Sequence, residues 1–103
     1  MMSREVSEKN VHEALETVMH PEIDASLIEL GMIKDVVVKR DKVIVTLALP
    51  FLGVPIRDYL VNITREAIMR LGVEANVKIA EMNREELQTF LAIERINIKF
   101  FHV

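Results

Sequence analysis

Cysteine is absent from this chain of 103 residues. Without cysteine the protein has no disulfide bond, no thiolate ligand for a metal and no thiol nucleophile. The absence is also compatible with a reducing compartment, so we expect a cytoplasmic protein. Any chemistry that the chain performs must come from other side chains.

Long apolar runs are absent as well. No stretch of the sequence approaches the ~20 apolar residues of a membrane-spanning helix. Residues 1–10 are polar and charged, unlike the apolar centre of a secretory signal. We therefore expect no membrane partner and no cleaved leader.

An excess of positive charge is the third absence. The 13 Lys and Arg residues are outnumbered by 16 Asp and Glu residues, which gives a net charge of −3. Proteins that bind nucleic acid usually carry a basic face, whereas the basic residues here are scattered, so we expect no nucleic-acid partner. Half of the residues are apolar and 28% are charged, as in soluble globular proteins. The length fits one domain over residues 1–103, and no linker or repeat divides it.

Apolar periodicity predicts three helices. Apolar residues at positions 11, 14, 15, 18 and 19 indicate an amphipathic helix over 7–19, which Pro21 ends. A second stripe over 56–71 predicts a helix with Pro55 as its first residue and Gly72 just past its end. Asn83 and Glu86 have a spacing close to a capping box, and they predict a third helix that reaches about Arg95.

Alternating and β-branched runs predict the strands. Residues 33–39 and 43–49 are rich in Val and Ile and are separated by a short charged break, which is typical of a hairpin. Residues 73–79 alternate between apolar and polar, which predicts a third strand with one wet face. The tail over 96–101 also alternates, and it could form a fourth, edge strand or pair with another copy in a homodimer.

These elements together predict an α+β fold in the order α-β-β-α-β-α, with the tail as an optional last strand. Strands joined through a helix should be parallel and connected right-handedly. The simplest packing places the helices on one face of a small mixed sheet of three to four strands. We expect the core of the domain over about 8–92 and a C-terminal tail over 93–103.

The first candidate site is the loop His20-Pro21-Glu22-Ile23-Asp24, which holds three potential metal or acid–base groups in five residues. A metal site needs several convergent ligands, and a loop alone does not show that they converge. Proline and aspartate also shape ordinary turns, and we favour that interpretation. Metal binding through His20, Glu22 and Asp24 stays open as the alternative, and we expect no bound metal.

The second candidate site is the loop before the second predicted helix. A helix start offers free N–H groups and a positive dipole end, Gly53 permits close approach, and Arg57 and Asp58 fall in the first turn. A single glycine followed by Pro55, which lacks an N–H, does not make a phosphate loop. Phe51 and Leu52 are apolar at the loop tip, where they could form a contact patch for a partner.

Several stretches, taken together, resemble the iron–sulfur cluster assembly domain family, which includes SufT, PaaD and the N-terminal domain of Mrp-type carriers. The first combines Pro21-Glu22 with Leu30-Gly31-Met32-Ile33, as the chain enters its first strand. The others are Gly53-Val54-Pro55 before the second helix and Leu71-Gly72-Val73 before the last strand. The similarity covers roughly residues 8 to 92.

The resemblance implies an α+β fold and a role in the maturation of iron–sulfur proteins. In that family a cysteine stands at the start of the second helix, where the dipole end would favour its thiolate. Val54 occupies the corresponding position here, and His20 stands where the family usually has aspartate. The resemblance therefore implies a cysteine-less variant that binds no cofactor directly and meets an iron–sulfur cluster only through a partner.

The leading hypothesis is a non-catalytic adapter that contacts protein partners of iron–sulfur assembly. Its expected contact residues are Phe51, Leu52, Val54, Arg57 and Asp58. The alternative is a small-molecule-binding or structural subunit of a larger enzyme, as PaaD-like relatives would imply. A freestanding enzyme is disfavoured, because the sequence shows no nucleophile motif and no paired catalytic groups.

Overall fold

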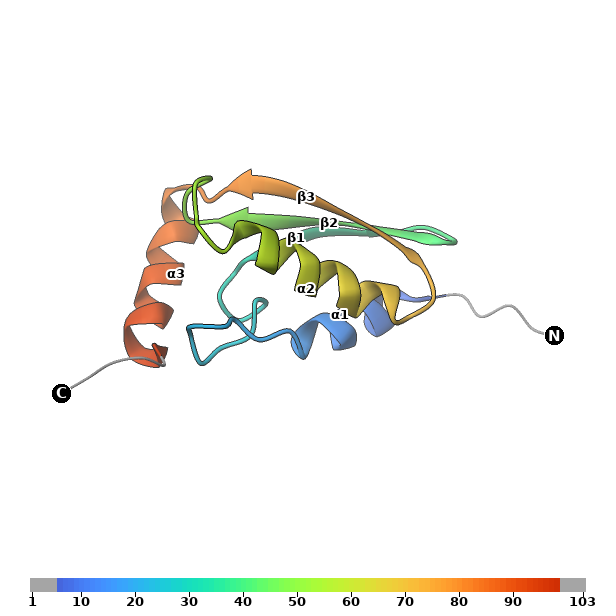
Figure 1. The fold of residues 1–103 in the computed structure, drawn as a ribbon, viewed down its shortest axis with the longest axis horizontal. Coiled ribbons are helices and arrows are strands. Elements are labelled where there is room, and N and C mark those ends of the chain that lie inside the picture. Colours follow the sequence, from blue (N-terminus) through green and yellow to red (C-terminus); the bar gives the residue numbers. More distant parts are fainter. Residues whose placement is uncertain (1–5, 99–103) are drawn as a thin grey trace.

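The computed structural model describes residues 6–98 of the chain (Figure 1). Three helices and three strands follow one another in the predicted order, so the α+β prediction is confirmed. The elements are α1 (Glu8–Glu16), β1 (Ile33–Val38), β2 (Lys42–Leu49), α2 (Arg57–Met69), β3 (Glu74–Glu81) and α3 (Arg84–Asn97).

The sheet has the order β1-β2-β3, with β2 in the centre. β1 runs antiparallel to β2 as the predicted hairpin, and β3 runs parallel to β2 after the α2 crossover. The parallel register is regular from Lys42 opposite Glu74 to Leu49 opposite Glu81. Val43, Val45 and Leu47 are fully buried on the helix-covered face, as their period-two spacing predicts.

A bulge interrupts β1. Its register against β2 shifts between Lys34 and Val37, and Asp35 adopts a positive φ of 54°. Aspartate tolerates this left-handed conformation better than most residues. The extra residue changes which side chains face the helices, so Ile33 and Val36 both pack on the core although they are three positions apart.

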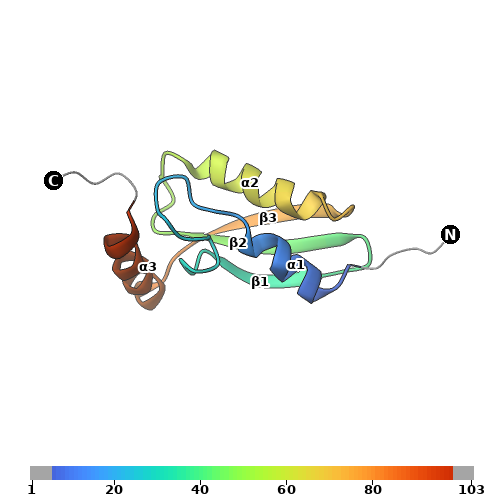
Figure 2. The same ribbon diagram turned by 90° about the horizontal axis from the view of Figure 1, so that it is seen from below.

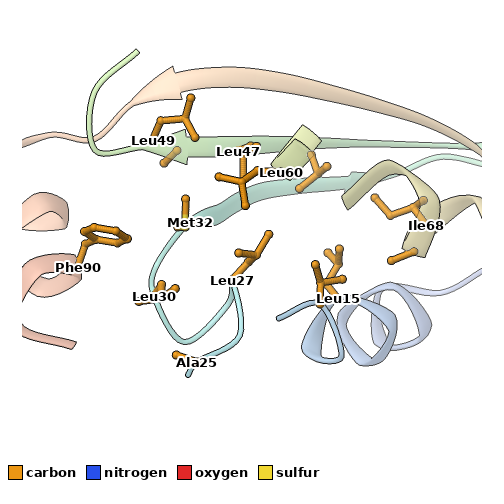
Figure 3. Packing of buried hydrophobic residues seen from close by; sticks show 14 of the residues in the cluster. Leu15, Ala25, Leu27, Leu30, Met32, Leu47, Leu49, Leu60, Ile68 and Phe90 are labelled. Atoms are coloured by element: carbon orange, nitrogen blue, oxygen red, sulfur yellow. The ribbon is translucent and has the colours of Figure 1, made fainter. Parts of the chain in front are cut away.

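Helices α1 and α2 cover one face of the sheet, α1 beside β1 and α2 over β3 (Figure 2). Helix α3 lies beyond the end of the sheet instead of over that face (Figure 1). Phe90 extends from α3 toward Met32 and Leu30 at the end of the core (Figure 3). The helix is therefore attached to the core mainly by one buried aromatic side chain.

The core is formed by the inner faces of these elements and by the segment that links α1 to β1. Its fully buried side chains include Leu15, Leu27, Leu47, Leu60 and Ile68 (Figure 3). Burying a side chain of this kind stabilises the fold by about 1.5–3 kcal/mol. No helix within residues 6–98 is long and apolar enough to cross a membrane.

Several predicted boundaries differ from the observed ones. Helix α1 ends at Glu16 instead of residue 19, because the chain turns at Thr17 and Met19 forms an isolated bridge with Ser26. Helix α2 begins at Arg57, so Pro55 precedes the helix by two residues and is not its first residue.

The predicted tail strand is wrong where the structure describes it. Helix α3 continues through Asn97, so Ile96 is helical, and Ile98 makes only an isolated bridge with Ile23. The rest of the predicted strand and homodimer segment, residues 99–101, lies outside the described residues. The predicted left-handed glycines are confirmed, with φ of 75° at Gly31 and 87° at Gly72.

Candidate functional site

A cleft of about 560 Å³ lies where the two candidate loops meet α3. One wall comes from the His20 loop, another from the loop before α2, and the third from α3. Apolar side chains dominate its lining. The lining residues are His20, Glu22, Ile23, Pro50, Phe51, Val54, Pro55, Ile56, Leu87, Phe90, Leu91, Glu94 and Ile98.

Hydrogen bonds within the His20 loop fix its shape. The imidazole is almost completely buried, and its Nδ1 accepts the backbone N–H of Glu22 at 3.0 Å. The backbone N–H of His20 donates to the carbonyl oxygen of Ala25 at 3.0 Å. Because Nδ1 acts as an acceptor, a neutral ring carries its hydrogen on Nε2. The imidazole therefore braces the turn that places Glu22 at the cleft.

The second wall is a tight turn before α2. The backbone N–H of Val54 donates to the carbonyl oxygen of Phe51 at 3.3 Å, and that of Arg57 donates to Val54 at 3.1 Å. The turn leaves the ring of Phe51 mostly exposed and Val54 half-buried. Ile56 occupies the cap position of α2 and makes no side-chain capping bond. An apolar ring and an apolar β-branched side chain thus face the space next to a helix start.

The third wall is one face of α3. Leu87, Leu91, Glu94 and Ile98 follow helical spacing and all line the cleft. Leu87 and Leu91 were expected to point inward. Leu87 is half-buried, whereas Leu91 is exposed because α3 lies at the end of the sheet. The continuation of this stripe to Ile98 was the sequence signal that could have identified the wall.

Contacts at both ends hold α3 in place. At its start, Asn83 and Glu86 form the predicted capping box, and Glu86 Oε2 pairs with Nζ of Lys34 on β1 at 3.0 Å. The backbone hydrogen bond from Asn83, followed by the Lys34 contact, lowers the pKa of Glu86. At its end, the backbone N–H of Asp24 donates to the carbonyl oxygen of Asn97 at 2.6 Å.

The structure thus brings together two groups of residues that the sequence analysis treated as separate sites. His20, Glu22, Phe51, Val54 and Pro55 line the same cleft. Leu52, Gly53, Arg57 and Asp58 line a smaller neighbouring hollow of about 150 Å³, which Val54 and Pro55 share. Pro21 and Gly31 line neither space.

The proposed metal ligands do not form a cluster. Asp24 is absent from the cleft that His20 and Glu22 line. Within residues 6–98 no group of three or more His, Cys, Asp or Glu side chains is arranged to hold a metal ion. The charged lining consists of the carboxylates of Glu22 and Glu94, with no lysine or arginine among the lining residues. The cleft is therefore suited to an apolar group that carries, or lies beside, a positive charge.

Comparisons with known proteins bear on this arrangement. The sequence model of a family described as "Iron-sulfur cluster assembly protein" matches residues 8–80. A search of curated proteins finds no match. Among solved structures, the crystal structure of a domain of unknown function, DUF59, from Bacillus anthracis superposes with a TM-score of 0.67. It is 19% identical, and the alignment covers 82% of this chain and 89% of that one, which shows a shared fold.

Proposed function

The chain belongs to the iron–sulfur cluster assembly protein family, and we propose that it acts there as a non-catalytic adapter which binds a protein partner in the cleft beside α3. The observation that carries this proposal is the apolar lining contributed by Phe51, Val54 and Leu91. Exposed aromatic and aliphatic side chains gathered around a concave surface are typical of binding sites for partners.

The residues available for direct cluster binding do not fit that role. Iron–sulfur clusters are held mainly by cysteine thiolates, and the chain has no cysteine. Val54, at the position where the resemblance places the family's cysteine, offers only methyl groups to the cleft. The proposal therefore leaves the cluster with the partner throughout.

The cleft also indicates the chemistry of the partner segment. Its apolar floor suits one or a few large apolar side chains, and Glu22 and Glu94 would pair with lysine or arginine beside them. We therefore expect a short segment of the partner that combines an apolar anchor with basic residues. Such a segment could come from a cluster scaffold or from an apoprotein that receives a cluster.

A variant of the cleft tests the adapter proposal. Tagged protein is incubated anaerobically with native extract, and captured proteins are quantified by mass spectrometry. The double variant Phe51→Asp with Leu91→Asp places carboxylates on the apolar lining at two exposed positions. We expect it to lose cluster-assembly partners by about tenfold or more, as a loss of about 1.4 kcal/mol in binding would produce.

The matched control is Val37→Asp, because Val37 is a similarly exposed apolar residue on β1 and is not among the lining residues. This variant should capture the same partners as the wild type. Circular dichroism establishes that all variants are folded. Equal capture by the double variant and the wild type would contradict the assignment of the cleft.

A second candidate function is supported by the size of the same cleft. Pockets for small ligands usually measure roughly 300–1,000 Å³ and have apolar walls with few polar groups. A cleft of about 560 Å³ with His20, Glu22 and Glu94 in its lining meets that description. A small-molecule-binding subunit would be recognised by a metabolite that raises the melting temperature of the wild type and not of Phe51→Asp with Leu91→Asp.

A further inference from the structure

Strand β3 has a free edge. It pairs with β2 on one side, and no other strand within residues 6–98 pairs with its second side. The strand runs from Glu74 to Glu81 without a proline and without a bulge in its register against β2. Unpaired backbone N–H and C=O groups along a regular edge form a template for another strand.

Two-fold symmetry limits how a second copy could pair with this edge. In an antiparallel pair, residues that lie opposite one another point to the same face of the sheet. The helix-facing residues of β3 are Ala75, Val77 and Ile79, so they must lie opposite one another. A pairing centred on Val77 places Ala75 of each copy opposite Ile79 of the other, which covers the exposed Ile79 side chain.

The polar face of β3 favours the same centre. Centring on Val77 sets Asn76 of one copy opposite Lys78 of the other. It also leaves Glu74 on the diagonal from that Lys78, within reach of a long side chain. Centring on Lys78 would place two lysines directly opposite, which is destabilising. Centring on Asn76 would pair Ile79 with Val73, which lies outside the strand.

Helix α2 presents a flank that fits this arrangement. Tyr59, Glu66 and Arg70 border a hollow at the end of α1, so the other side of α2 faces away from α1. Because α2 packs over β3, that other side overlooks the free edge (Figure 2). By helical spacing it carries an acid, an apolar residue, a base and an exposed methionine, namely Asp58, Val61, Arg65 and Met69.

We propose that two copies of this chain associate through antiparallel pairing of their β3 strands, centred on Val77, to form one six-stranded sheet. The two-fold axis sets the α2 helices antiparallel on the same face, with Asp58 of each copy near Arg65 of the other. The surface is self-complementary in charge and in apolar contact, which identifies a second copy as its occupant. None of its strand residues lines the cleft, so the dimer can fail without affecting the adapter proposal.

Sedimentation of the full chain tests the dimer. We expect a species of twice the monomer mass of 11.8 kDa. Ile79→Lys should sediment as a monomer, because an inward-pointing charge on an edge strand blocks pairing. Val37→Lys is the matched control on the β1 edge, since Val37 is 45% exposed and Ile79 is 41% exposed. This control should remain dimeric, and a wild type that sediments only as a monomer overturns the proposal.

Single cysteines test the register, because the wild-type chain has no thiol of its own. Residues directly opposite across an antiparallel pair have Cα atoms about 4.5–5.5 Å apart, which a disulfide can span. Val77→Cys should therefore form a disulfide-linked dimer on mild oxidation, whereas Ala75→Cys should not. A crosslink through Lys78→Cys in place of Val77→Cys overturns the register, and absence of a crosslink in folded Val77→Cys overturns the pairing.

Discussion

Single residues decide what the cleft can offer chemically. The Nδ1 atom of His20 is engaged by the backbone of Glu22, so this nitrogen serves the turn and is not free to bind a metal. Val54 presents methyl groups where a thiol would offer a ligand. The remaining ionisable groups of the lining, Glu22 and Glu94, are acids. Together these residues favour recognition of a partner over a reaction.

Glu86 gives a prediction about pH at the same scale. Its pKa is lowered in the folded protein, first by the hydrogen bond from the backbone of Asn83 and then by Lys34. A lowered folded-state pKa means that the stabilisation is fully present above the ordinary value of 4.5 and is lost as pH falls through the folded-state value. Acid should therefore weaken the attachment of α3.

Thermal melts of the wild type and Glu86→Gln between about pH 6 and about pH 3 check this expectation. Glutamine keeps the acceptor for Asn83 but cannot ionise. The wild type should lose more of its melting temperature than the variant as the pH falls, and the two curves should converge at the acidic end. Parallel curves over the whole range would show that the Glu86 charge contributes nothing.

Among the elements, α3 has the most consequence for the site, and its end contacts explain why. The capping box fixes its first turn, and the hydrogen bond from Asp24 to Asn97 fixes its last. Asn83→Ala removes the cap, for which we expect a loss of about 1 kcal/mol in the free energy of unfolding. The same variant should weaken partner binding, because a frayed first turn displaces Leu87.

Ser7→Ala is the matched control, because Ser7 heads an equivalent capping box on α1, which lines no part of the cleft. Urea denaturation should show a similar loss of stability in both variants. Partner capture should fall only for Asn83→Ala. If Ser7→Ala reduced capture equally, the effect would come from global stability and not from the position of α3.

The element scale also shows what the sequence could predict. The order of helices and strands, the parallel β2–β3 pair and the cap of α3 all follow from local periodicity and end signals. The cleft does not follow from them, because it depends on long-range contacts. The pair Lys34–Glu86 spans 52 residues of sequence, and no local pattern indicates it.

The whole molecule depends on a core that is small for its length of chain. A domain of this kind is stable by only about 5–15 kcal/mol, so one deep cavity removes a large share. Leu47 lies on the central strand β2 and is 0% exposed. Leu47→Ala should therefore cost about 2–5 kcal/mol.

Leu52→Ala is the companion variant, because Leu52 is 47% exposed and its truncation should change stability by less than about 0.5 kcal/mol. Urea denaturation at one fixed protein concentration measures both, since association of copies would make the apparent stability depend on concentration. A loss below about 1 kcal/mol for Leu47→Ala would show that the site relaxes around the missing atoms.

The position of α3 also has a consequence for the timing of synthesis. A ribosome releases the sheet and both covering helices before it releases α3, since β3 ends at Glu81 and α3 runs from Arg84 to Asn97. A nascent chain at that stage has nearly all of its interior and none of the third wall beside Phe51 and Val54. Partners of the cleft would therefore be met only by a finished polypeptide, and a chain still being translated would pass them by.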